Sequence, residues 1–328
     1  MNVNECVQNV ENAEEENFLR QQKGKNQKKT FKREGTIFLT VILALPVMHW
    51  LVFWLYVNVQ SIVLAFQDPL TSVPTLDNFV ALWNDITNPL TSTIGVALKN
   101  TFLFFALHLF ATMPISLCIA FFLYKRIMGY KIFRVIFYFP AIISSLIMVT
   151  VFRNFISPEG PLGYIVKAFG GSLPAQGLLV GYDGTPTITI MVYCVWTGFT
   201  RDVLLFNGGM SRIPTEVLES AKLEGCGPFR EIVSIVLPMI WPTVSTQIVF
   251  IFTGMFSAGG PILFLTNGSY QTSTIAFWIF TQVYGDGTVG GSGVYNMVSC
   301  AGLCFTLIGV PLILFIKWLL GKVDAVEY

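Results

Sequence analysis

Six long apolar stretches, nearly free of charged residues, constrain this chain more than any other feature of its sequence. A helix needs about 20 apolar residues, within a range of roughly 17–25, to cross the hydrocarbon core of a bilayer. In that core every backbone polar group has to be bonded within the protein, which favours helices. We therefore predict an all-α integral membrane protein with six transmembrane helices, at about 37–66, 101–124, 135–152, 186–206, 239–266 and 294–316.

The composition supports a membrane protein and argues against several other classes. Charged residues make up 12% of the 328 residues, against about 25% in ordinary soluble domains, and the mean hydropathy is +0.64. A net charge of +1 argues against a nucleic-acid partner. The two histidines and six dispersed cysteines form no metal-ligand pattern, so we expect no bound metal and no catalytic residues.

One further apolar run, 274–284, lies between the fifth and sixth predicted spans. It has 11 residues, and this length is too short for a helix that crosses the hydrocarbon core. We therefore predict a re-entrant or interfacial helix there.

Basic residues predict the orientation of the spans. Of the 20 Lys and Arg residues, 17 lie on one side of the predicted bundle and three, Lys99, Arg153 and Lys167, on the other. Cytoplasmic loops carry the excess of basic residues, so both termini are predicted to be cytoplasmic, as an even number of spans requires. The predicted organisation is a disordered cytoplasmic tail, 1–34, a membrane domain, 35–322, and a short cytoplasmic tail, 323–328.

The segment 212–238, between the fourth and fifth spans, is more ordered in its pattern than a simple connector. We predict a helix over Pro214–Glu224, with Pro214 at its first position. Gly225 is predicted to take a positive φ just past the helix end. A second helix, Phe229–Leu237, is predicted to stop at Pro238. The alternative is an amphipathic helix that lies on the lipid surface.

The residues of this segment follow a spaced motif. Glu219-Ser220-Ala221 is followed after three residues by Gly225, and after nine more by Ile235-Val236-Leu237-Pro238. This pattern resembles the EAA loop of ABC importer permeases, E-A-A, three residues, G, nine residues, I-x-L-P. Only the second position departs from it, because Ser220 stands where the family has alanine. The wider context, from Ile213-Pro214 to Phe229, is similar to carbohydrate-importer permeases of the maltose and glycerol-phosphate type.

The resemblance implies a fold and a set of partners. The fold would be the six-helix bundle of a type I ABC importer permease in the cell membrane. The loop would couple to a separate ATPase through Glu219, Ser220, Ala221, Gly225, Ile235, Leu237 and Pro238. The partners would be two ATPase subunits, a second, unlike permease subunit, and an extracellular or periplasmic binding protein that delivers a carbohydrate. The chain contains no G-x-x-x-x-G-K-[ST] loop, so ATP would be used by the partner ATPase and this chain would bind no cofactor.

Polar side chains in two spans are candidates for the solute path, because polar groups inside a membrane are costly. In span four, Tyr193, Trp196 and Thr197 share one helix face. In span five the candidates are Gln247, Ser257, Gly259 and Gly260, where small residues allow the helix to unwind. The alternative is ordinary packing between helices, since small and hydroxyl residues are common at helix contacts in membranes.

Two other functions are compatible with parts of this pattern. The first alternative is an ABC importer permease for a non-sugar solute. The second is a stand-alone proton- or sodium-coupled transporter, which needs carboxylates inside the membrane. Arg201 and Asp202 are predicted to mark the cytoplasmic end of span four, and His49 and His108 to be packed neutral imidazoles, so the spans would supply no such carboxylate.

Overall fold

The computed structural model describes residues 35–36, 38–88, 92–257, 260–285 and 292–323. The chain divides into two compact units, 1–63 and 64–328. In the first unit the structure describes an apolar helix, Phe38–Ala65, whose last two residues belong to the second unit. Its parts include a π-helical segment, η1 (Trp50–Tyr56), and α2 (Val57–Ala65). The predicted tail 1–34, and all but the first residue of the predicted tail 323–328, lie outside the described residues.

Four described helices are long and apolar enough to cross a membrane: Phe38–Ala65, Thr93–Tyr124, Thr185–Met210 and Val294–Leu320. They confirm four of the predicted spans as continuous helices. Two bent pairs of helices bring the number of possible spans to six. The two remaining predicted spans fall on these bent pairs, and neither is one straight helix.

The second predicted span, 101–124, begins earlier than expected. It consists of α4 (Thr93–Leu107), a π-helical turn η2 (His108–Thr112), and α5 (Met113–Tyr124). Ser92 caps the helix, since its Oγ accepts a hydrogen bond from Gly95 N at 2.6 Å. Pro114 lies in the first turn of α5, directly after the π-helical turn, where a missing N–H is tolerated.

The third predicted span, 135–152, is wrong as a single helix. The structure has α6 (Tyr130–Ile142) and α7 (Ser145–Ile156), which is followed by α8 (Pro161–Ala168). The axes before and after the break are bent by 111°. Pro140 lies in the last turn of α6, where it removes a backbone donor, and Ile143 is extended at φ −86° and ψ 144°.

The fifth predicted span, 239–266, is also wrong as a single helix. Its regular part is α13 (Trp241–Thr253), followed by η4 (Met255–Ser257) and α14 (Ile262–Leu265). Thirteen residues of α-helix are about 20 Å long, shorter than the roughly 30 Å core of a bilayer. The helix before it, Pro228–Met239, meets α13 at 81°, and the two together form the second bent pair.

The short helix predicted at 274–284 is confirmed as α15 (Ile275–Tyr284). Its start is held by α4, because Asn100 donates hydrogen bonds to the carbonyls of Gln271 and Ser273 at 2.7 and 2.8 Å. Thr101 Oγ1 accepts a further bond from Ile275 N at 2.9 Å. The remaining long elements are α9 (Thr185–Met210), α16 (Ser292–Leu320) and α3 (Asp77–Thr87).

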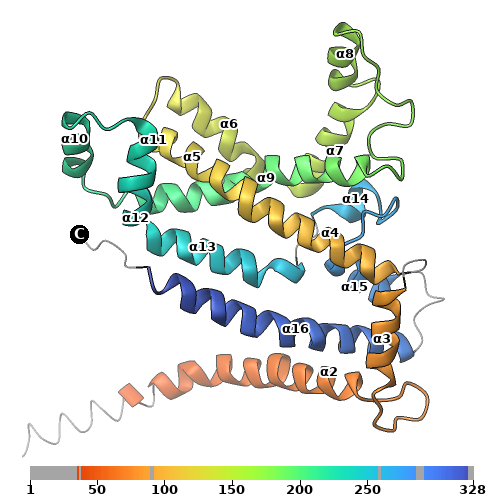
Figure 1. Ribbon diagram of the computed structural model, residues 1–328. Coiled ribbons are helices and arrows are strands. Elements are labelled where there is room, and N and C mark those ends of the chain that lie inside the picture. Colours follow the sequence, from red (N-terminus) through yellow and green to blue (C-terminus); the bar gives the residue numbers. More distant parts are fainter. Residues whose placement is uncertain (1–34, 37, 89–91, 258–259, 286–291, 324–328) are drawn as a thin grey trace, which may run out of the picture. The chain divides into compact units, whose positions relative to one another are not determined.

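The second unit is a helical bundle with its core in three apolar clusters. In Figure 1, α5 crosses α9 at an angle, and α9 contacts both α5 and α13. The first cluster joins these three helices to residues of the segment 212–238, such as Leu218, Ile232 and Val236. That segment, which we call the 212–238 loop, is therefore packed on the bundle by the same core that holds the helices together.

Candidate functional site

The first half of the 212–238 loop is a short helix that ends in a tight turn. It is α10 (Thr215–Leu223), and the predicted positive φ of Gly225 is confirmed at +73°. Cys226 N donates to Ala221 O at 3.0 Å and Gly225 N donates to Lys222 O at 3.0 Å, which is the Schellman arrangement. A Cβ at Gly225 would meet nothing within 4 Å. The backbone conformation, and not a lack of space, therefore requires glycine.

The start of α10 differs from the prediction by one residue. Pro214 has φ −58° and ψ 136°, so it precedes the helix as its N-cap and is not its first helical residue. An extended ψ of this kind cannot continue a helix. The helix itself begins at Thr215.

The two edges of α10 face different surroundings. Leu218 and Ala221 are buried, and Leu218 belongs to the first apolar cluster. Glu219 and Ser220, from the same motif, are exposed. Leu223 is 91% exposed and Phe229, beyond the turn, is 81% exposed. Helix α10 thus contacts the bundle through one edge, while two large apolar side chains flank its terminating turn at the surface.

The second half of the loop differs from the predicted helix Phe229–Leu237. It runs through α11 (Pro228–Glu231), a π-helical turn η3 (Ile232–Val236), and α12 (Leu237–Met239). Pro238 therefore does not stop it. Leu237 N donates to the carbonyl of Ile232, five residues back, so Pro238 falls at the start of a new α-helical register, where no N–H is needed. Ile235 and Leu237 are half-buried against the first cluster.

A buried ion pair ties the loop to α5. Glu231 is 1% exposed, and its Oε2 accepts a charge-assisted hydrogen bond from Lys125 Nζ, just past the end of α5. The same ammonium lies 5.1 Å from the centre of the Phe121 ring, a favourable cation–π distance. Glu231 Oε1 has no hydrogen-bond partner among the described residues. The sequence carries no signal for this pair, because its members are 106 residues apart.

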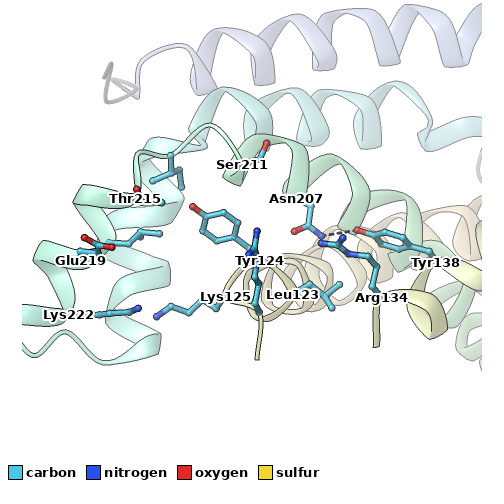
Figure 2. Close-up of a pocket in the computed structure, with 13 residues that line it drawn as sticks. Leu123, Tyr124, Lys125, Arg134, Tyr138, Asn207, Ser211, Thr215, Glu219 and Lys222 are labelled. Carbon is cyan, nitrogen blue, oxygen red and sulfur yellow. Dashed lines mark hydrogen bonds between the residues drawn. The ribbon is translucent and has the colours of Figure 1, made fainter. Parts of the chain in front are cut away.

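A cavity of 580 Å³ separates α10 from the ends of α5, α6 and α9. Figure 2 shows Glu219 and Lys222 of α10 on one side of it, with Lys125 opposite. On the far wall, Asn207 of α9 donates to Tyr138 Oη of α6 at 3.0 Å (Figure 2). On the side of α10 that carries Glu219, this cavity separates the helix from the bundle. Its charged lining residues are Lys125, Arg126, Arg134, Glu219 and Lys222.

The three predicted solute-path residues of α9 lie in packing contacts. Tyr193 is 4% exposed and belongs to the second apolar cluster, with its ring 5.0 Å from that of Phe152. The Trp196 ring lies 6.1 Å from the Phe152 ring, and Thr197 Oγ1 donates to Tyr193 O at 3.0 Å. These contacts are of the packing kind that the sequence left as the alternative. A role of the three residues in transport stays a prediction.

The two predicted glycines follow η4. Gly259 lies outside the described residues. Gly260 has φ +53°, and a Cβ there would lie 2.7 Å from Cys194 Sγ of α9. The chain therefore approaches α9 closely at this point, and a side chain would force the two apart.

Gln247 and Ser257 line a second cavity, of 290 Å³, between α4, α9 and α13. The wall combines aromatic rings with polar side chains, the combination typical of sites that bind small polar molecules. This cavity brings together two residues that the sequence predicted and two that it assigned elsewhere, His108 and Arg201. Its lining residues are Phe104, Phe105, His108, Arg201, Gln247, Phe250, Ile251, Gly254, Met255 and Ser257.

Behind this wall, Asp202 joins three helical segments. Its Oδ2 lies 3.0 Å from His108 Nε2 of η2, and its Oδ1 accepts a hydrogen bond of 2.6 Å from Gln247 Nε2 of α13. The Asp202 side chain is 1% exposed and the His108 side chain 40% exposed. The Asp202 carboxylate therefore fixes the imidazole of His108 and the amide of Gln247 at the cavity wall.

This network changes the prediction for His108 and shows which groups surround Asp202. Helix α9 continues for eight residues beyond Asp202, to Met210, so Arg201 and Asp202 do not end the helix. That they mark the cytoplasmic end of the span stays a prediction. His108 is not simply packed, because it is bonded to a carboxylate. A charge is tolerated inside a membrane helix when a partner meets it, and these partners are 94 and 45 residues away in the sequence.

Replacing Asp202 by asparagine is expected to destabilise the bundle. Asp202→Asn keeps the size of the side chain but removes the charge that two partners share, and hydrogen bonds to charged groups contribute about 1.5–3 kcal/mol each. Thermal unfolding of the purified chain in detergent measures the loss. Glu159→Gln is the control, because that carboxylate is exposed beyond α7, and should change stability by less than about 0.5 kcal/mol. Equal stability of the two variants would contradict the role of the network.

Comparison with known proteins shows which family this chain resembles. Residues 113–325 match the family described as "Binding-protein-dependent transport system inner membrane component". The multiple sugar-binding transport system permease protein MsmF of Streptococcus mutans is 26% identical over 196 residues, 58% of this chain and 64% of that protein. The arabinooligosaccharides transport system permease protein AraP of Halalkalibacterium halodurans is 25% identical over 217 residues, 65% of this chain and 66% of that protein. The chain thus spans less than two thirds of the length of these curated relatives.

A solved structure shares the fold. The crystal structure of a bacterial ABC transporter involved in the import of the acidic polysaccharide alginate contains a chain that matches with a TM-score of 0.74 at 20% identity. The match covers 90% of this chain and 99% of that one, so the helical bundle is an ABC importer permease fold. With a family match over more than half of its residues, the chain belongs to the family of binding-protein-dependent transport system inner membrane components.

Proposed function

We propose that this chain is one membrane-spanning permease subunit of an ATP-driven saccharide importer. It supplies part of the translocation path and carries the loop through which a separate ATPase drives transport. The observation that supports this most directly is the 212–238 loop. Its helix α10 is closed by the Schellman turn at Gly225 and packed into the bundle core through Leu218, yet it exposes Leu223. A helix held in this way can pass a displacement from a bound ATPase to the bundle as one rigid element.

The proposed assembly contains this chain, a second permease subunit, two ATPase subunits and an external solute-binding protein. The family is binding-protein-dependent, and a related structure was solved with a periplasmic protein carrying an alginate pentasaccharide. For the ATPase contact, the exposed pair Leu223 and Phe229 offers apolar surface beside the motif residues Glu219 and Ser220. Exposed apolar side chains rimmed by polar ones are typical of protein interfaces.

The proposed orientation places the 212–238 loop and both termini in the cytoplasm. Basic residues gather around this loop and the neighbouring ends of α5 and α6, and cytoplasmic segments are enriched in such residues. Lys125, Arg126, Arg134 and Lys222 line one cavity there. Lys131, Arg212 and Arg230 lie in the same segments of the sequence.

The proposed coupling route runs from α10 into the helices that line the 290 Å³ cavity. Movement of α10 reaches α5, α9 and α13 through the shared first cluster, and the buried pair of Lys125 and Glu231 fixes α11 to the end of α5. Interdigitated cores transmit displacement because they are close-packed. Hydrolysis of ATP at the cytoplasmic face would thereby open or close the solute path.

A saccharide is proposed as the solute because the named relatives transport sugars and the cavity wall suits one. Phe104, Phe105 and Phe250 provide aromatic rings, while Gln247 and Ser257 provide hydrogen-bonding groups. The alternative of a non-sugar solute for the same kind of importer is separated by a transport assay. A stand-alone ion-coupled transporter is not supported, because the family works with a binding protein and both oxygens of the intramembrane carboxylate of Asp202 are engaged.

Cross-linking tests the ATPase contact. In a functional variant without native cysteines, Leu223→Cys is expected to form a cross-link with an ATPase subunit when the complex is treated with a short thiol-reactive linker. Leu218→Cys is the matched control, because this leucine is 9% exposed and faces the core. Capture of the ATPase by the first variant alone supports the proposal. Labelling of Leu223→Cys only by lipid-soluble reagents would instead favour a helix lying on the membrane surface.

A further inference from the structure

Arg201 lines the 290 Å³ cavity, and none of the described residues around it carries a carboxylate. Arg201, His108, Gln247 and Ser257 contribute the polar part of the wall. Asp202, the next residue of α9, is 1% exposed and bonded through one oxygen to His108 and through the other to Gln247. Both oxygens of this carboxylate are therefore engaged within the chain.

Arg201 is the cation that remains. Among the described residues, no carboxylate oxygen lies within the 4.0 Å ion-pair distance of its guanidinium. Arginine stays charged at every relevant pH. Arg201 lies nine residues before the end of α9 at Met210, about 14 Å along the helix axis. The exposed guanidinium of Arg201 therefore lies in the cavity wall away from the helix end, where it can bind an anionic group of a solute.

The rest of the wall fits a sugar ring. Phe104, Phe105 and Phe250 line the cavity, and aromatic rings are apolar surfaces against which the C–H groups of a pyranose can pack. Its volume of 290 Å³ lies just below the roughly 300–1,000 Å³ range of ligand sites, which leaves room for one sugar unit. When a sugar unit carries a carboxylate, the guanidinium of an arginine can form two parallel hydrogen bonds with it.

We propose that the imported saccharide is acidic, with a carboxylate on at least one sugar unit, and that Arg201 binds this carboxylate in the translocation path. The inference rests on the proposed function and narrows its substrate class. Gln247 and His108, held by Asp202, face the hydroxyl groups of the same unit. Arg201 then determines specificity, because a neutral sugar leaves its charge unmatched.

Uptake by the reconstituted importer tests the proposal. The complete complex, with its binding protein and ATPase subunits, is assembled in vesicles and given two panels of disaccharides. The acidic panel contains digalacturonate, diglucuronate and dimannuronate, and the neutral panel contains the corresponding hexose disaccharides. We expect ATP-dependent uptake from the acidic panel and at least about tenfold less from the neutral one, because an Arg–carboxylate pair is made only with the acidic sugars.

Two variants test whether Arg201 determines the selectivity for acidic disaccharides. Arg201→Gln is expected to reduce uptake of the preferred acidic disaccharide about tenfold or more, while Arg201→Lys keeps the charge but loses the bidentate geometry and is expected to fall between. Arg201 is exposed and unpaired within the described residues, so both variants should unfold at the wild-type temperature. Preference for the neutral panel, or wild-type uptake by Arg201→Gln, would overturn the proposal.

The same assay separates this inference from the proposed function. Neutral disaccharides imported with ATP hydrolysis would leave the saccharide importer standing and reject the acidic substrate. A complex that imports neither panel, and whose ATPase responds to no loaded binding protein, would reject both.

Discussion

Gly225→Val is expected to reduce ATP-coupled uptake about tenfold or more while leaving the chain folded in the membrane. Gly225 has φ +73°, a region that costs an ordinary L-residue about 1–2 kcal/mol and is most strained for a β-branched one. Valine therefore drives the turn out of the left-handed region and breaks the two Schellman hydrogen bonds to Ala221 and Lys222. Helix α10 then loses its fixed angle to α11, and the ATPase meets a misplaced surface.

Uptake in reconstituted vesicles and ATP hydrolysis measure this effect together. We expect uptake to fall about tenfold or more, since a factor of ten corresponds to about 1.4 kcal/mol, with hydrolysis no longer responding to solute. Gly227→Val is the matched control two residues away. Gly227 has φ −72° and ψ 158°, which valine adopts readily, and a Cβ there meets nothing within 4 Å. Equal uptake by the two variants would remove the turn from the coupling mechanism.

Lys125→Met is expected to cause the largest loss of stability of any single change considered. It leaves the Glu231 carboxylate, 1% exposed, without its cation, and removing one partner of a buried pair costs about 3–5 kcal/mol. Thermal unfolding of the purified chain in detergent measures the loss. Because the pair joins α11 to the end of α5, uptake should fall in parallel with stability.

A double variant separates the pair from its individual members. Lys125→Met with Glu231→Leu removes both charges, and apolar replacement of a buried ion pair is often neutral or stabilising. The double variant should therefore be more stable than Lys125→Met alone. Glu224→Gln is the control for an exposed carboxylate of the same loop and should lie within about 0.5 kcal/mol of the wild type. If Lys125→Met stays that close to the wild type, the pair does not hold the loop.

These two changes address different properties of one element. Gly225 sets the angle at which α10 ends, and the pair of Lys125 and Glu231 sets where α11 is fixed to the bundle. The proposed transfer of force from an ATPase requires both. If α10 keeps its angle but α11 is no longer fixed to the end of α5, the loop can move while the bundle stays in place. The first variant should therefore uncouple a stable protein, whereas the second should weaken the protein itself.

Features that depend on neighbouring residues could be predicted from the sequence. The apolar runs 37–66 and 294–316 are helices, and the run 274–284 is the short helix α15. The left-handed turn at Gly225 was also predictable. Hydrophobic length and the conformational freedom of glycine act within a few residues of chain, so a single sequence carries their signal.

Features that depend on distant partners could not be predicted in this way. The third and fifth apolar runs look like single spans, but the structure bends or interrupts them where helices meet, around Ile143 and Gly254. Pro238, expected to stop a helix, is accommodated by a π-helical turn. A proline within an apolar run weakens a helix without saying whether the helix bends there or continues, so the angle of each bend became visible only in the folded chain.

By itself, then, the sequence determined that the chain is a helical membrane protein with an ordered loop at 212–238 and a turn at Gly225. Only the tertiary structure decided that Asp202 lies inside the bundle, bonded to His108 and Gln247, and that Arg201 lines a cavity beside them. Length and hydrophobicity are properties of one segment. The placement of a buried charge depends on the groups that other helices bring to it, and these become neighbours only when the chain folds.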